Sequence, residues 1–300
     1  MYKIGKLVAM VKRVKRFGDR KDARLIREVD GVHVVLANVM GERCENEAVL
    51  TMDIDSRPLD AYLKLKNASG DKKDKYTYLQ LFIAALSKTI ELRPKLNYFV
   101  CNSRYYEKDE ISFVFVAKRY LDDSSDEILI FSKYDPEDER SPLQQIHDRY
   151  VEKVYPLKAD RDGKQVGDPL EVFARMPKPI VKLVGKIVRA LDRHGHLPWS
   201  IQNMDPSHVT CFISNLGSID MVADYHHLTN WGTTSIFALM GRKTRKPVYD
   251  DDGSFELIPF IPLSFTVDER IADGVYFHKS LMILRDLLEH PEKLEEGNSK

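Results

Sequence analysis

The chain has 300 residues, of which 43% are hydrophobic, and it carries 46 basic and 46 acidic side chains. This is enough for one large domain with a substantial core, and the balanced charge gives no global signal for nucleic-acid binding. The three cysteines, Cys44, Cys101 and Cys211, lie far apart without metal-ligand spacing, which is typical of a reducing compartment. No apolar run approaches the roughly 20 residues that span a bilayer, and no secretory cleavage pattern is present. We therefore expect a soluble, cytoplasmic protein without a metal site or a nucleic-acid partner.

Residues 1–30 are predicted to form a basic N-terminal arm or short amphipathic helix. Basic residues there interleave with apolar ones at Ile4, Leu7, Val8 and Val11. Packing on the body or on a neighbouring subunit is the favoured role, and membrane contact is the alternative.

The next elements are predicted from hydrophobic periodicity. Residues 76–92 carry apolar side chains at helical spacing, and Pro94 ends this helix. Residues 122–126 are predicted to form a solvated turn, and residues 158–167 a loop. Strands are expected at 32–38, 49–54, 111–117 and 127–132, and a surface helix at 142–154.

A second amphipathic helix opens near Pro177 and Pro179 and ends at Gly195. One stripe of it is apolar, and the opposite stripe holds Lys178, Lys182, Lys186, Arg189 and Arg193. A solvated face is the favoured interpretation of the segment Lys178–Arg193, and contact with an anionic surface or an acidic partner is the alternative.

The last third is denser in strands, which are predicted at 209–214, 233–241 and 255–267. A closing helix around residues 277–288 and a flexible tail at 295–300 follow. Alternating helices and strands indicate an α/β or α+β domain over residues 31–294 with a mixed sheet. No glycine-rich phosphate loop follows a strand, so a nucleotide enzyme is not expected.

Two strand ends carry candidate chemistry. The first is the run from Thr210 to Gly217, which contains Ser214 and Asn215, and the second is Asp268-Glu269-Arg270-Ile271-Ala272-Asp273-Gly274. Catalytic side chains are often mounted at strand ends, because the strand fixes them while the loop leaves them accessible. From the residues alone, ordinary turn chemistry is the favoured interpretation of both segments.

Together these segments resemble the catalytic domain of the 2-oxoacid dehydrogenase dihydrolipoamide acyltransferases, which shares its fold with chloramphenicol acetyltransferase. The matching segments cover most of the chain: 76–97, ending Arg93-Pro94-Lys95-Leu96-Asn97; Ile213-Ser214-Asn215-Leu216-Gly217; 233–241, with the lysine-proline turn Lys246-Pro247-Val248; and 263–274 with the closing helix. The resemblance implies a two-layer sandwich, with a mixed sheet and helices on one face. It also implies a homotrimer whose site lies between subunits, with coenzyme A or acyl-CoA as co-substrate.

Carried over residue by residue, the resemblance assigns Ser214 as the hydroxyl that stabilises the oxyanion. Asp273 is the structural acid, held by an arginine ion pair, and Gly274 completes the motif. Asn215, Gly274, His226 and His227 are candidate substrate-binding residues. One of the two histidines, which lie in a loop, is an alternative catalytic group; a plain surface role is the favoured interpretation of both.

Glu269 stands where the family has its catalytic histidine. The family's histidine takes the proton of a thiol, for which imidazole is well matched. A carboxylate is a much weaker base toward a thiol unless burial desolvates it. Glu269 is therefore expected to act as a base in a desolvated pocket, to orient a substrate, or to mark a lost activity.

The matching region begins within about the first thirty residues, which leaves no room for a lipoyl or subunit-binding module. We therefore expect a stand-alone thioester-dependent acyltransferase with an unknown small acceptor and no covalent lipoyl group. The alternative is a catalytically inactive trimeric binding or scaffold protein.

Overall fold

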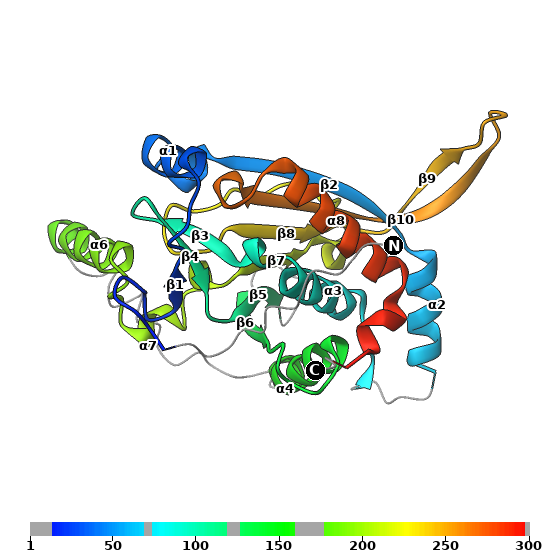
Figure 1. Ribbon diagram of the computed structural model, residues 1–300. Helices are drawn as coiled ribbons and strands as arrows, with labels where there is room; N and C mark the ends of the chain where they lie inside the picture. Colours follow the sequence, from blue (N-terminus) through cyan, green and yellow to red (C-terminus); the bar gives the residue numbers. More distant parts are fainter. Residues whose placement is uncertain (1–13, 69–73, 119–126, 160–176, 298–300) are drawn as a thin grey trace.

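The computed structural model describes residues 14–68, 74–118, 127–159 and 177–297. The six strands of one sheet run in the order β2-β10-β8-β7-β5-β6, and β9 (Thr244–Tyr249) extends β10 as a projecting hairpin (Figure 1). Strand β7 pairs in parallel with β5 and with β8, and the other pairs in this sheet are antiparallel. The predicted mixed sheet is therefore confirmed.

The strands of the main sheet have the following bounds: β2 Glu47–Asp55, β5 Ile111–Lys118, β6 Glu127–Tyr134, β7 Cys211–Asn215, β8 Ile236–Met240 and β10 Phe255–Asp268. Each overlaps a strand predicted from the sequence. A smaller sheet has the order β1-β4-β3, with β1 Ala23–Leu25, β4 Arg104–Lys108 and β3 Tyr98–Cys101.

Helices cover one face of the main sheet. Helix α3 (Tyr78–Leu92) is buried along most of its length and packs with α4 (Pro142–Ala159) and α8 (Gly274–Glu289). Helix α2 (Arg57–Lys66) lies beside α8 (Figure 1). The main core lies between these helices and the inward side chains of the strands, which matches the expected two-layer sandwich.

Residues 32–38 were predicted as a strand, and this prediction is wrong. They form helix α1 (Gly31–Val39), because Asp30 caps it by accepting a hydrogen bond from the N–H of His33. Four exposed valines on α1 gave the segment its strand-like composition.

Both ends of the described chain pack on the body. In the described part of residues 1–30, Arg20 is buried and β1 pairs with β4, which is packing on the body as the favoured interpretation expects. The predicted tail begins too early, because Glu295 ends the short helix η7 (Pro291–Glu295) and pairs with Lys66 at 2.8 Å. The turn predicted at 122–126 lies outside the described residues, as does most of the loop predicted at 158–167.

Candidate functional site

Ser214 lies near the end of β7, on the face of the sheet opposite the helices. Its neighbours Cys211 and Ile213 belong to the main core, so the alternation along the strand turns Phe212 and Ser214 to the other face. The pairing register places Ser214 beside Leu239, and Leu239 beside Ser264. Ser214 is partly exposed at the end of this row.

Glycines allow the chain to turn closely after Ser214. A Cβ on Gly217 would lie 2.8 Å from the carbonyl oxygen of Gly241, and a Cβ on Gly241 would lie 2.1 Å from the nitrogen of Ala223. The loop after β7 is thereby drawn against the ends of β7 and β8, where the N–H of Arg242 donates to Met221 at 2.7 Å. This contact explains the small residues of the Ser214 turn.

His226 and His227 lie on that same loop and cover the serine face of the sheet. The ring of His226 stacks on Phe237 at 4.3 Å between centroids and on His227 at 4.5 Å. Phe237 stacks in turn on Phe212, two residues before Ser214. Both histidines are exposed, and His226 sits on the face of the sheet that carries Ser214.

Glu269 lies immediately after β10, as the first residue of the short helix η6 (Glu269–Ile271). Its N–H donates to the carbonyl of Asn46 at 2.9 Å, which fixes the backbone against the turn before β2. Its side chain is exposed in the single chain. The single chain therefore does not supply the desolvation that a carboxylate base would require.

A buried ion network holds this strand end. The guanidinium of Arg270 donates to both carboxylate oxygens of Asp268, at 2.8 and 2.7 Å, and both residues are at most 1% exposed. The Nε of Arg43 lies 3.7 Å from the same carboxylate. Arg270 also donates to the carbonyls of Met40 and Gly41 at the end of α1.

Arg43 extends the network to the loop that carries the histidines. It donates to the carbonyls of Thr229 at 2.6 Å and Gly232 at 3.0 Å. The end of α1, the histidine loop and the Glu269 turn are thus joined through one carboxylate, that of Asp268. This role is not apparent from the sequence, although the Asp-x-Arg spacing is.

The resemblance assigned the arginine ion pair to Asp273, and the structure does not bear this out. Asp273 is the N-cap of α8 and accepts a hydrogen bond from the N–H of Tyr276 at 2.8 Å, which holds the pKa of Asp273 below its ordinary value. Among the residues that the structure describes, no arginine pairs with Asp273, and the buried arginine pair belongs to Asp268 instead. Gly274 follows as the first, exposed residue of α8.

Ser214 and Glu269 lie far apart on the sheet within one chain. Ser214 is in register with Ser264 through Leu239, and Glu269 follows Ser264 by five positions along β10. At about 3.4 Å per residue and about 4.8 Å between strands, the two α-carbons are about 20 Å apart. One chain therefore does not bring these two side chains together.

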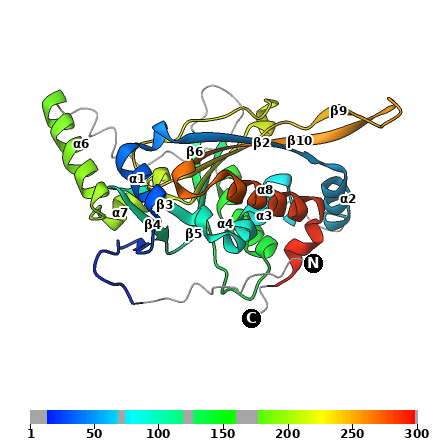
Figure 2. The ribbon, with the colours of Figure 1, turned by 45° about the horizontal axis from the view of Figure 1, so that its top comes forward.

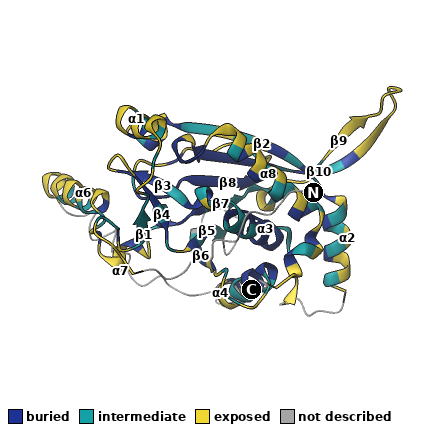
Figure 3. Cartoon of the chain, viewed as in Figure 1, coloured by how far each residue is buried: buried dark blue, intermediate teal, exposed yellow. Residues whose placement is uncertain are grey.

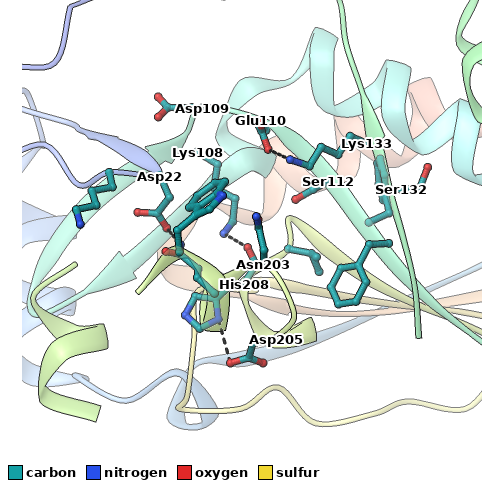
Figure 4. Close-up of a pocket in the computed structure, with 16 residues that line it drawn as sticks. Asp22, Lys108, Asp109, Glu110, Ser112, Ser132, Lys133, Asn203, Asp205 and His208 are labelled. Carbon is teal, nitrogen blue, oxygen red and sulfur yellow. Dashed lines mark hydrogen bonds and ion pairs between the residues drawn. The ribbon is translucent and has the colours of Figure 1, made fainter. Parts of the chain in front are cut away.

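A well-defined pocket lies elsewhere, between the small sheet and the β5 and β6 edge (Figure 4). Its volume is about 360 Å³, and its polar lining includes Asp22, Lys108, Asp205 and His208. Lys108 is buried, and its ammonium donates to the carbonyl of His208 at 3.0 Å and to the hydroxyl of Thr233. These contacts are internal to the fold.

Two titratable groups in this pocket have shifted pKa values. Burial lowers the pKa of Lys108 to about 7, despite the nearby carboxylate of Asp22. Burial opposes the charged form of His208, but its contacts with Asp192 and Asp205, at 2.8 and 3.1 Å, outweigh this and raise the pKa of His208. His208 therefore belongs to a buried ion network that ties the end of helix α6 (Lys178–Arg193) to the body.

Lys108→Met is expected to flatten the pH dependence of stability. The folded protein holds this proton less tightly than the unfolded chain does, so the penalty of burying the charge is present below pH 7 and is relieved as the pH rises toward 10.5. Wild-type stability should therefore gain about 3–4 kcal/mol more than that of the variant between pH 7 and 10. Urea unfolding at a series of pH values measures this difference.

Lys133→Met is the matched control, because the ammonium of Lys133 is half exposed and pairs with Glu110 at the same pocket. The stability of this variant should rise with pH as steeply as that of the wild type. Equal slopes for wild type and Lys108→Met would show that Lys108 is not the group responsible.

Within the described residues, no group of three or more histidine, cysteine or acidic side chains is arranged to hold a metal ion. No helix in the same part of the chain is both long and apolar enough to span a membrane.

The comparisons with known proteins agree with this geometry. Solved structures first define the class as the chloramphenicol acetyltransferase-like fold: a chloramphenicol acetyltransferase is 11% identical, with a TM-score of 0.53, and the alignment covers 89% of this chain and 99% of that one. A probable dihydrolipoamide acetyltransferase from Listeria monocytogenes is 18% identical with a TM-score of 0.52, over 92% of this chain and 97% of that one. The fold expectation is therefore confirmed.

Residues 183–295 also match the family model of the 2-oxoacid dehydrogenases acyltransferase catalytic domain. The chain thus resembles that domain in sequence from within α6 to the end of η7, a range that includes both Ser214 and Glu269. No curated protein sequence matches the chain.

A third solved structure bears on the motif. It is a dihydrolipoamide acetyltransferase from Azotobacter vinelandii, 17% identical with a TM-score of 0.53, over 90% of this chain and 94% of that one. In that protein the roles of a serine, a histidine and an asparagine in the catalytic mechanism were investigated, and the histidine and the asparagine are four positions apart.

Proposed function

We propose that this protein is an acyltransferase that uses a thioester such as acyl-CoA, with Ser214 of one chain and Glu269 of another forming each site of a homotrimer. The observation that carries the proposal is the placement of these two residues. Both occupy positions of the family motif, yet their α-carbons lie about 20 Å apart on one sheet. Residues so placed can meet only across an interface between chains.

The surface beside Glu269 supports such an interface. The end of α1 contacts the Glu269 turn through Arg270, and Val32, Val35 and Val39 of α1 are 58–76% exposed. Val275, in the first turn of α8, is 64% exposed. Exposed apolar residues gathered beside a candidate catalytic residue are typical of a subunit contact. Burial by a second chain would also desolvate the carboxylate and strengthen it as a base.

The proposed chemistry needs one base and one hydrogen-bond donor. Glu269 takes the proton from the acceptor nucleophile, which attacks the thioester carbonyl. The hydroxyl of Ser214 donates to the oxyanion of the tetrahedral intermediate. Collapse of the intermediate breaks the carbon–sulfur bond, and the leaving thiolate takes the proton back from Glu269.

Thiol release from acetyl-CoA and longer acyl-CoA esters, measured with a panel of small amines, alcohols and thiols, tests the proposal. Glu269→Gln and Ser214→Ala should each lower the rate by about 10²–10³, because each loses one transition-state interaction. Glu269→His should retain more activity than Glu269→Gln, since it restores the family's base. Equal rates for wild type and all three variants would exclude this mechanism.

The alternative is an inactive trimeric binding protein, which the exposed Glu269 in the histidine position favours. It predicts that coenzyme A gives no binding heat in titration calorimetry. Binding of coenzyme A that is weakened by Ser214→Ala would count against it. His226→Asn tests the alternative assignment of a loop histidine as the catalytic base. It should lower the activity only if His226, on the serine side of the site, is that base.

A further inference from the structure

Helix α6 lies at the periphery of the molecule and projects from the body (Figures 1 and 2). Its sequence separates apolar and basic residues almost completely, with one type on each side of the helix. A helix with this pattern normally buries its apolar stripe against a core. Here a large part of that stripe is in solvent.

The exposure of the apolar stripe is large. Ile180, Leu183 and Ile187, which share one side of the helix, are 48%, 59% and 51% exposed. Figure 3 shows α6 coloured as exposed along most of its length. Apolar exposure continues into the adjoining helix α7 (Trp199–Gln202), where Trp199 is 50% exposed. Among the residues that the structure describes, this surface therefore has no full partner.

The charge on the helix is of one sign. Lys178, Lys182, Lys186 and Arg189 are exposed on the side opposite the apolar stripe. Asp192 is the one acidic residue in the helix, and it is buried against His208. No acidic side chain of α6 therefore offsets the positive surface.

We infer that α6 docks this protein on an anionic lipid bilayer. The apolar stripe would enter the boundary between headgroups and acyl chains, while the lysines and Arg189 contact anionic headgroups beside it. Nucleic acid would satisfy the cations but leave the apolar stripe in water. A second copy of α6 would cover the stripe but would bring two cationic helices together.

Co-sedimentation with vesicles tests the docking. Wild type should bind vesicles of equal parts phosphatidylcholine and phosphatidylserine. It should bind vesicles of phosphatidylcholine alone far less. The triple variant Lys182→Gln/Lys186→Gln/Arg189→Gln should lower the partition coefficient about hundredfold, because each cation near the surface contributes a similar electrostatic attraction. Ile187→Glu should lower it at least about tenfold, because it places a carboxylate in the inserted stripe.

Two matched controls change the same chemistry elsewhere. Lys64→Gln/Arg245→Gln/Lys279→Gln removes three exposed cations from other elements, and Leu65→Glu adds a carboxylate at an exposed apolar residue of α2. Both should bind as wild type does. The inference is overturned if the α6 variants bind as the controls do, or if wild type ignores phosphatidylserine. A smaller oligomer for Ile187→Glu in light scattering would overturn it as well, since the stripe would then be covered by another copy.

Discussion

Asp268→Asn is expected to lower the free energy of unfolding by about 3–5 kcal/mol. The change keeps the size of the side chain but removes its charge. It leaves the guanidiniums of Arg270 and Arg43 buried without their carboxylate. Removing one partner of a buried ion pair costs far more than the pair contributes, because the remaining charge stays desolvated. Urea unfolding measures the loss.

The chain contains its own control for this prediction. Asp55 and Arg57 have the same Asp-x-Arg spacing and the same two-pronged geometry, but Arg57 is about half exposed. Asp55→Asn should therefore cost at most about 1 kcal/mol. If the two variants lose similar stability, burial is not what makes the Asp268 pair important.

The same substitution should also make the position of the Glu269 turn less fixed. Asp268 joins the end of α1 and the histidine loop to the turn that presents Glu269, through Arg270 and Arg43. Its loss should therefore reduce any acyltransferase activity more than the stability loss alone accounts for, measured well below the unfolding temperature. Asp268 is a positioning residue in this sense, since it acts through the turn that carries Glu269.

Local patterns predicted most of the main sheet and its helices. Helix α3 was predicted nearly to the residue, because its apolar spacing is clean and Pro94 follows its end. Helix α1 was mistaken for a strand, because four valines in solvent look like a buried strand when no tertiary contact is known. Lys246-Pro247-Val248 was assigned to a turn but belongs to β9, an outer strand of a hairpin where proline is tolerated.

The site was predictable only in part. Ser214 and Glu269 stand out in sequence because each lies at a strand end within a recognisable motif. Their separation is set by the β7-β8-β10 register, which depends on pairing between distant segments and leaves no local trace. The Asp268 network depends on burial by α1 and by the loop that carries the histidines. In the sequence, its Asp-x-Arg spacing is the same as that of the exposed pair at Asp55, so the spacing alone does not reveal the buried network.

Mixing two inactive variants is expected to restore activity if each site is built from two chains. Ser214→Ala and Glu269→Gln should each be inactive as a homotrimer, since every interface then lacks one group. In a mixed trimer, an interface that joins Ser214 of the Glu269→Gln chain to Glu269 of the Ser214→Ala chain is intact. Random assembly from equal amounts gives about a quarter of the wild-type number of intact sites.

This rescue distinguishes the shared site from a site within one chain. The variants would be unfolded together and refolded, or co-expressed with different tags, and thiol release from acyl-CoA would then be measured. Mixing Glu269→Gln with the double variant Ser214→Ala/Glu269→Gln should give no rescue, because no chain then supplies Glu269. If Ser214 and Glu269 reacted within one chain, the first mixture would stay as inactive as this control. Recovery near a quarter of the wild-type rate would instead mean that the 20 Å gap between the two residues is closed by a neighbouring subunit.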